Sequence, residues 1–142
     1  MKNRKAFAKW EGNLKNGKGS VKLDSVEQKL NYNFISRFEE GDQTNPEELI
    51  AAAHAGCYSM ALSGLLTEEG FEPKSIETVA TVSLEKKDNG FRITKSALKT
   101  EANVPGIDKE TFQQLAEKAK VNCPVSQALT ALNVSLEAIL NT

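Results

Sequence analysis

The stretch that decides the fold is LIAAAHAGCYSMALSGLL, residues 49–66, where small and apolar side chains occupy nearly every face of a helix. A helix that is apolar all round has to be enclosed, either by protein or by lipid. Its polar members, among them His54 and Cys57, would be costly against lipid. We therefore predict a long buried central helix that is enclosed by protein on all sides, and no membrane span.

Helix-start and helix-stop signals flank this stretch. Before it, TNPEE, residues 44–48, provides a cap residue, an early proline and acidic side chains suited to a helix N-terminus. After it, Gly70 is expected to end the helix. Glu47 and Glu48 most simply serve the N-terminus, where one of them closes a capping box, but either could instead orient an arginine.

The N-terminal part of the chain predicts strands. Residues 7–10 and 21–23 flank the turn-forming segment 16–19, which indicates two short antiparallel strands. A third strand is predicted over residues 32–38, where side chains alternate between two faces. This alternation places Arg37 on the same face as the apolar Ile35.

The second half of the chain predicts an α+β fold. We expect, in chain order, a strand over residues 76–84, a turn at 88–90, a strand over 91–98, a helix capped by Asp108, a short helix opening at Pro124 and a closing strand over 132–136. The helix after Asp108 carries an apolar stripe made of Phe112, Leu115, Ala116 and Ala119. The fold is expected to be a largely antiparallel β-sheet with a long buried central helix and a second helical segment, in one domain over residues 1–142.

Composition and charge narrow the function classes. The 142 residues carry 18 Lys and Arg against 19 Asp and Glu, for a formal net charge of -1, and no basic block gathers the lysines. A nucleic-acid partner is therefore not expected. Residues 1–10 are polar and Lys-rich without the hydrophobic centre of a secretory signal, so we expect a cytoplasmic protein.

Two cysteines in a reducing cytosol indicate redox chemistry or metal binding. Cys57 lies mid-helix, where burial alone would raise its thiol pKa, and it could be an inert core residue. Cys123 precedes Pro124 at a helix start, where the dipole favours a thiolate. A structural zinc ion wants four ligands, and one His with two distant Cys falls short, so neither metal nor cofactor is expected.

Two further side chains could act on a thiol. His54 lies one helical turn before Cys57, so it is either a locally satisfied polar group or half of a Cys-His pair, as in a cysteine hydrolase. A hydrolase would also need an oxyanion hole, for which no loop is evident. Arg37, one of three arginines, either assists a buried thiolate or is a solvated strand residue.

The motifs together form a pattern that extends along nearly the whole chain. They are Trp10-Glu11-Gly12, Gly17-Lys18-Gly19, Thr44-Asn45-Pro46-Glu47-Glu48-Leu49-Ile50, Ala53-His54-Ala55-Gly56-Cys57-Tyr58-Ser59-Met60-Ala61, Val104-Pro105-Gly106-Ile107-Asp108 and Asn122-Cys123-Pro124-Val125-Ser126. The chain resembles the OsmC family, the osmotically inducible hydroperoxide peroxidases. The related organic hydroperoxide resistance proteins place their arginine earlier, where this chain offers only lysines, so the OsmC branch fits better.

The resemblance implies a role for four residues. Cys57 matches the cysteine that attacks the peroxide, and Cys123 matches the resolving cysteine. Arg37 matches the activating arginine, and Glu47 matches the acid that holds this arginine. These implied roles overrule the dipole argument, which favoured Cys123 as the thiolate.

The resemblance also implies an activity. A protein of this family reduces organic hydroperoxides, and more weakly hydrogen peroxide, through a Cys57 sulfenate and then a Cys57–Cys123 disulfide. An external dithiol restores the thiols, and the resemblance points to lipoyl groups on carrier proteins. The alternative is a redox-sensing or binding module that forms the same disulfide without turnover.

Helix geometry predicts how the site is completed. Glu47 and Cys57 are ten residues apart on one helix, which separates them by about 15 Å along the axis. We therefore expect Glu47, with Arg37, to complete the site around Cys57 of a partner subunit in a symmetric dimer. The family resemblance likewise implies an intertwined homodimer with sites at the interface.

Overall fold

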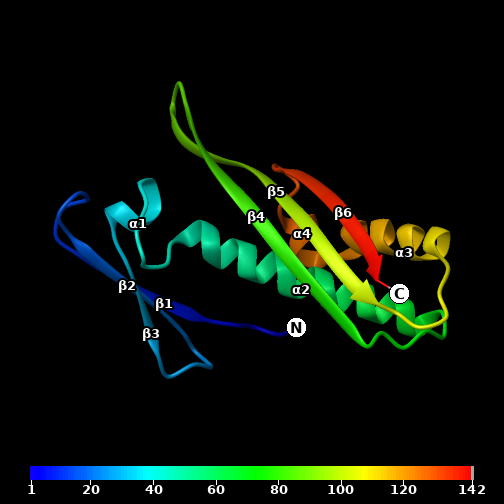
Figure 1. Cartoon of the computed structure of the whole chain (residues 1–142). Helices are drawn as coiled ribbons and strands as arrows, with labels where there is room; N and C mark the ends of the chain where they lie inside the picture. The colour runs from blue at the N-terminus through cyan, green and yellow to red at the C-terminus, as the bar shows by residue number, and fades with distance from the viewer. Residues whose placement is uncertain (142) are drawn as a thin grey trace. The chain divides into compact units, whose positions relative to one another are not determined.

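The computed structural model describes residues 1–141 (Figure 1). Within this range the chain forms two compact units, one made of residues 1–49 and one that begins at Ile50. Together their strands and helices make an α+β protein, as predicted from the sequence.

The N-terminal unit contains a three-stranded antiparallel sheet. Strands β1 (Ala6–Glu11), β2 (Lys18–Leu23) and β3 (Lys29–Tyr32) pair in the order β1-β2-β3. The first two strands confirm the sequence prediction. Gly19 lies against the rings of Trp10 and Tyr32, and a Cβ atom there would come within 2.6 Å of both, so the packing of this sheet requires glycine.

The predicted third strand is wrong beyond Tyr32, because the chain turns into helix α1 (Phe34–Phe38). Asn33 and Ser36 form a capping box: the Ser36 N–H donates to Asn33 Oδ1 at 2.8 Å, and the Asn33 N–H donates to Ser36 Oγ at 2.9 Å. These bonds satisfy the first backbone donors of a helix. Arg37 therefore lies in the last turn of α1 and not on a strand face shared with Ile35.

Helix α2 (Pro46–Glu68) begins and ends as the sequence predicts. The Glu48 N–H donates to the Asn45 side chain at 2.8 Å, which caps the N-terminus. Gly70 has a φ of 87°, and the Phe71 and Gly70 N–H groups donate back to the carbonyls of Leu66 and Thr67. This pattern is a Schellman motif, which favours glycine at the left-handed position.

Burial of α2 within this chain is one-sided, so a single copy does not provide the predicted enclosure by protein on all sides. Tyr58, Leu62 and Leu66 are fully buried, whereas Met60 is 78% exposed. The small residues Ala52, Ala53 and Gly56 lie on the exposed side. Helix α2 is long and apolar enough to cross a membrane, but core helices of soluble proteins can have the same length and composition.

The C-terminal unit contains a three-stranded sheet of mixed direction. Strands β4 (Ser75–Lys87) and β5 (Gly90–Asn103) form an antiparallel hairpin, and β6 (Asn133–Asn141) pairs with β5 in parallel. Gly90, with a φ of 111°, serves the predicted hairpin turn. Strand β5 continues to Asn103, beyond the predicted end at Leu98, and the parallel β5–β6 pairing departs from the largely antiparallel sheet.

Helices α3 (Lys109–Asn122) and α4 (Pro124–Ala128) lie with α2 on one face of this sheet (Figure 1). Asp108 caps α3 as predicted, accepting a bond from the Thr111 N–H at 2.9 Å. All four residues of the predicted apolar stripe are buried. They join the core residues of the other elements, among them Tyr58, Leu62, Leu66, Leu98, Ala102, Val104 and Cys123.

Candidate active site

The two cysteines meet in the C-terminal unit although 66 positions separate them in the sequence. Cys57 is half-buried on α2, and Cys123 is fully buried where α3 ends and α4 begins. Both are free thiols, and their sulfur atoms are 3.0 Å apart. The two sulfurs are therefore close enough to form a disulfide with little movement.

The surroundings of the two thiols differ. Burial, followed by the hydrogen bond with Cys123, raises the pKa of the Cys57 thiol. Burial also opposes ionisation of Cys123, but its interactions with Cys57, Ser126 and Val125 outweigh burial and lower the pKa of Cys123. Within its own unit, Cys123 is thus the better thiolate, as the helix-start argument predicted, and a cation close to Cys57 would favour its ionised form.

His54 does not pair with Cys57, so the hypothesis of a Cys-His nucleophile is wrong. Its ring is fully buried, with Nδ1 2.7 Å from Ser96 Oγ and Nε2 2.7 Å from Ser126 Oγ. Burial lowers the pKa of His54, so the ring is neutral near pH 7. His54 thus links α2 to β5 and to α4.

Tyr58, next to the nucleophile candidate, ties α2 to α3. Its hydroxyl donates to the Ala116 carbonyl oxygen at 3.0 Å, and the side chain is fully buried. Burial raises the pKa of Tyr58, and the charges of Glu117 and Cys123 act in the same direction. The phenol therefore stays protonated and holds the segment that carries Cys57 against the helix that leads to Cys123.

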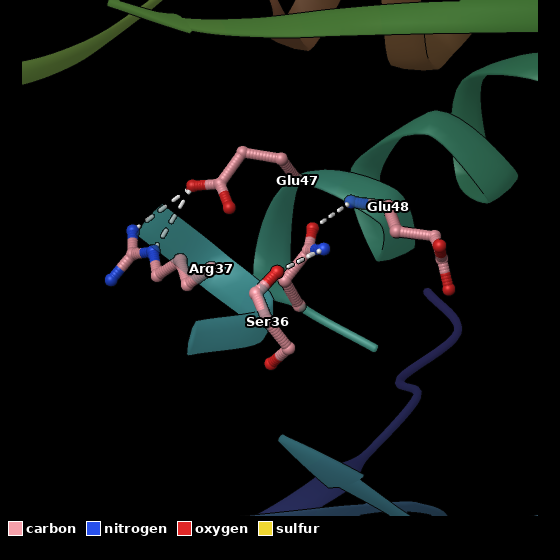
Figure 2. Close-up of polar contacts among 5 residues, drawn as sticks. Ser36, Arg37, Glu47 and Glu48 are labelled. Carbon is pink, nitrogen blue, oxygen red and sulfur yellow. Dashed lines mark hydrogen bonds and ion pairs between the residues drawn. The ribbon is translucent and has the colours of Figure 1, made fainter. Parts of the chain in front are cut away.

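An arginine and a carboxylate form the second part of the predicted site, within the N-terminal unit (Figure 2). Arg37 Nε and Nη2 donate to Glu47 Oε1 at 3.3 and 3.0 Å. Glu48 instead accepts a bond from the Thr44 hydroxyl, so Glu47 is the acid that holds Arg37. Glu47 is only 6% exposed, and its Oε2 atom has no hydrogen-bond partner among residues 1–141.

A hollow of about 270 Å³ lies beside Arg37 in the same unit. It is lined by Trp10, Leu14, Tyr32, Asn33, Phe34, Arg37 and Phe38. Most of these side chains are apolar or aromatic, so the hollow suits an organic group next to a guanidinium.

Sequence reasoning did not find the two serines that hold His54. Ser96 and Ser126 lie 42 and 72 positions after His54, on strand β5 and on helix α4. The sequence held one signal for Ser126, because it is the third residue after Cys123. At that position of a helix a polar side chain can reach back to the capping residue. No three His, Cys, Asp or Glu side chains are arranged to hold a metal ion in the described part of the chain.

Known proteins resemble this chain in both sequence and fold. Peroxiredoxin OsmC of Escherichia coli strain K12 is 57% identical over 129 residues, which cover 90% of each chain. The organic hydroperoxide resistance protein OhrB of Bacillus subtilis strain 168 is 34% identical over 96 residues, covering 66% of this chain and 68% of OhrB. The crystal structure of an organic hydroperoxide resistance protein OsmC from Legionella pneumophila, 25% identical, superposes with a TM-score of 0.68 and covers 100% of each chain.

The family model for OsmC-like proteins matches residues 39–137. This range contains Glu47, Cys57 and Cys123, and it includes α2 and the whole mixed sheet except the last residues of β6. The match covers well over half of the chain. The chain therefore belongs to the OsmC-like protein family.

Proposed function

We propose that this protein is a thiol-dependent peroxidase that reduces organic hydroperoxides. The observation that carries the proposal is the 3.0 Å separation of a half-buried and a fully buried sulfur, both free thiols. Such a pair supports oxidation of the accessible thiol followed by capture of the product by the buried one. The names of the relatives, a peroxiredoxin and hydroperoxide resistance proteins, point to the same chemistry.

In the proposed cycle, the Cys57 thiolate attacks one oxygen of the hydroperoxide. The O–O bond breaks, the alcohol leaves with a proton, and Cys57 becomes a sulfenic acid. Cys123 then attacks the Cys57 sulfur, a disulfide forms, and the sulfenic oxygen leaves as water. An external dithiol reduces the disulfide by exchange, and lipoyl groups on carrier proteins are our candidates in the cytoplasm.

Arg37 and Glu47 are proposed to supply the charge that Cys57 lacks in its own unit. A guanidinium near the sulfur would lower the pKa that burial raises. Glu47 would hold the guanidinium in place through the pair seen within the N-terminal unit. The unpartnered Oε2 atom of the buried Glu47 supports a further donor at this carboxylate, because such an atom is costly when left unsatisfied.

We propose that the arginine and the cysteine of one site come from different subunits of a homodimer. Along one helix, the ten positions between Glu47 and Cys57 correspond to about 15 Å. The exposed side of α2, with Ala52, Ala53, Gly56 and Met60, offers small and apolar groups for close packing against a second copy. A symmetric dimer would bring two such helices together.

The proposed substrate preference follows from the hollow beside Arg37. Its aromatic lining suits the alkyl or aryl part of an organic hydroperoxide, which hydrogen peroxide lacks. Burial of that part adds hydrophobic binding energy. We therefore expect a higher kcat/KM for cumene hydroperoxide than for hydrogen peroxide.

The test is peroxide consumption with dihydrolipoamide as reductant, for the wild type, Cys57→Ser and Cys123→Ser. The wild type is expected to turn over many equivalents of cumene hydroperoxide. Cys57→Ser should be inactive, while Cys123→Ser should consume about one equivalent and accumulate a sulfenate that dimedone traps.

Two results would contradict the proposal. Consumption of a single equivalent by the wild type, with dihydrolipoamide in excess, would favour a redox sensor that forms the disulfide without turnover. Full turnover by Cys57→Ser would remove Cys57 from the nucleophile role.

A further inference from the structure

A connected set of buried polar side chains leads from β5 to the buried cysteine. Ser96, His54 and Ser126 are joined by two contacts of 2.7 Å, and the Ser126 side chain lowers the pKa of Cys123, which lies three residues before it. Ser96, His54 and Cys123 are fully buried, and Ser126 is 9% exposed. Three polar side chains from three elements thus lead to one sulfur, and the cycle described above gives them no role.

The position of Ser126 follows from the local fold. Cys123 is the N-cap of α4 with no side-chain capping bond of its own, and Ser126 is the third residue of that helix. A side chain at the third helical position reaches back to the capping residue. The backbone of the same turn, at Ser126 and Val125, also lowers the pKa of Cys123.

The state of His54 decides which way the serine hydroxyl points. A neutral imidazole has one N–H donor and one bare nitrogen. With the proton on Nε2, the ring donates to Ser126 Oγ and accepts from the Ser96 hydroxyl through Nδ1. Ser126 is then left with its own hydroxyl hydrogen to donate, and the Cys123 sulfur is the acceptor beside it.

We propose that Ser126 is a hydrogen-bond donor that stabilises the Cys123 thiolate during disulfide formation, and that His54, held by Ser96, is the residue that positions it. This inference deepens the peroxidase function proposed above and rests on it for its role in turnover. It assigns the resolving step a dedicated set of side chains, separate from the arginine pair proposed for Cys57.

Ser126 assists the step in which Cys123 forms the disulfide with Cys57. The Cys123 thiolate attacks the sulfur of the Cys57 sulfenic acid, the S–S bond forms, and the S–O bond breaks. The departing hydroxide takes up one proton, equal to the one that Cys123 released, and leaves as water. Cys123 is oxidised while the Cys57 sulfur is reduced from the sulfenic to the disulfide level.

Few ionisable groups near Cys123 could produce the same effect. From α2 the groups that act on Cys123 are Cys57 and Tyr58, while His54 contacts Ser126. Glu117 of α3 acts on Tyr58 and pairs with Lys120 at 3.2 Å. Helix α4 itself carries no ionisable side chain. On the strands, Lys95 beside Ser96 and Glu137 of β6 are exposed.

The first experiment measures Cys123 without any peroxidase activity. In Cys57→Ser, Cys123 is the only cysteine of the chain, and its thiolate absorbs at 240 nm. We expect Cys57→Ser/Ser126→Ala to titrate about one pH unit higher than Cys57→Ser, with Ser126→Thr restoring the midpoint because it keeps the hydroxyl. His54→Gln should move the midpoint in the same direction as Ser126→Ala.

The matched control is Ser59→Ala in the same background. Ser59, on α2, likewise uses its hydroxyl in a partly buried bond, to Thr78 Oγ1 of the sheet at 2.8 Å, but it makes no hydrogen bond to Cys123. Its loss should leave the titration unchanged. Equal midpoints for Cys57→Ser and Cys57→Ser/Ser126→Ala, with folding verified by circular dichroism, would overturn the proposal.

The second experiment follows one turnover. After one equivalent of cumene hydroperoxide and no dithiol, Ser126→Ala should convert sulfenate to disulfide about tenfold more slowly than the wild type at pH 7, and the gap should close at higher pH. A gap that persists at all pH values would assign Ser126 a purely structural role. If the wild type forms no sulfenate, the peroxidase function fails, while the 240 nm titration still tests the hydrogen bond.

Discussion

At the residue scale, His54 is the only histidine of the chain, and its ring has no access to water. Both ring nitrogens bond to serine hydroxyls at 2.7 Å, which a neutral ring can satisfy as one donor and one acceptor. A protonated ring would need two acceptors and would carry an unpaired charge in the core. Burial therefore lowers the pKa of His54 and makes the fold sensitive to acid.

The first prediction concerns this sensitivity. Below the ordinary pKa of about 6.5, the unfolded chain binds a proton at His54 and the folded chain does not, so stability falls as pH drops. The slope is up to about 1.4 kcal/mol per pH unit between pH 6.5 and the lowered folded pKa. Urea unfolding at pH 6.5 and pH 5 should show this loss in the wild type.

His54→Gln provides the comparison, because it removes the titrating group and keeps an amide donor and acceptor. This variant should be less stable at pH 6.5 but lose less stability between pH 6.5 and pH 5. Asp108, whose pKa is also lowered by its bonds to Thr111, acts only below its ordinary range near 4. Parallel slopes in the two proteins would contradict a neutral buried imidazole.

The residues of the site were accessible from the sequence to different degrees. Cys57 and Cys123 stood out as the only two thiols, and their resemblance to family motifs supplied their pairing. The contact between Arg37 and Glu47 was expected only from the family resemblance, since the sequence alone left Glu48 open as the partner, and Arg37 was assigned to the wrong element. The serines around His54 could not be predicted, because nothing local marks a contact that tertiary packing makes across 42 or 72 positions.

At the element scale, helix caps explain both the correct and the incorrect predictions. The cap at Asp108 coincides with a clear apolar stripe, so α3 was predicted with its buried residues. At Asn33 the alternating pattern of residues 32–38 favoured a strand, but the capping box with Ser36 favours a helical turn. Over only five residues, α1 is too short for hydrophobic periodicity to distinguish the two.

The second prediction tests the cap of α3. Asp108 accepts from the Thr111 N–H at 2.9 Å and from the Thr111 hydroxyl at 2.7 Å. Asp108→Ala should lower the free energy of unfolding by about 1 kcal/mol, because the first-turn donors lose their acceptor. Asp108→Asn should retain most of the stability, since asparagine caps equally well, and urea titration at pH 7 measures both. An equal loss in both variants would indicate that charge, and not capping, is the stabilising factor.

At the scale of the whole molecule, the site is proposed to need two chains. The Arg37–Glu47 pair lies in the N-terminal unit, and the two thiols lie in the C-terminal unit. The exposed side of α2 was not expected from a helix that is apolar all round, and a second copy packed on it would resolve the difference. In the sequence, the only sign of such a packing surface is that α2 has no polar face.

The third prediction uses subunit complementation. Arg37→Ala and Cys57→Ser should each be inactive as homodimers. A co-expressed heterodimer, purified through two different tags, should recover about half of the wild-type activity, because one of its two sites combines an intact arginine with an intact cysteine. An inactive heterodimer would mean that Arg37 serves the Cys57 of its own chain and would contradict the shared site. Coordinates that show Arg37 beside the Cys57 of the same chain would contradict it as well.

The proximity of Cys57 and Cys123 also links oxidation to the stability of the fold. A covalent bond there would close a loop spanning the whole β4–β5 hairpin and α3, and on chain-entropy grounds a loop of this length restricts the unfolded chain by about 4 kcal/mol. The oxidised protein would thus be harder to unfold than the reduced one. Exposure to peroxide would therefore raise the stability of this protein until a dithiol reduces the bond.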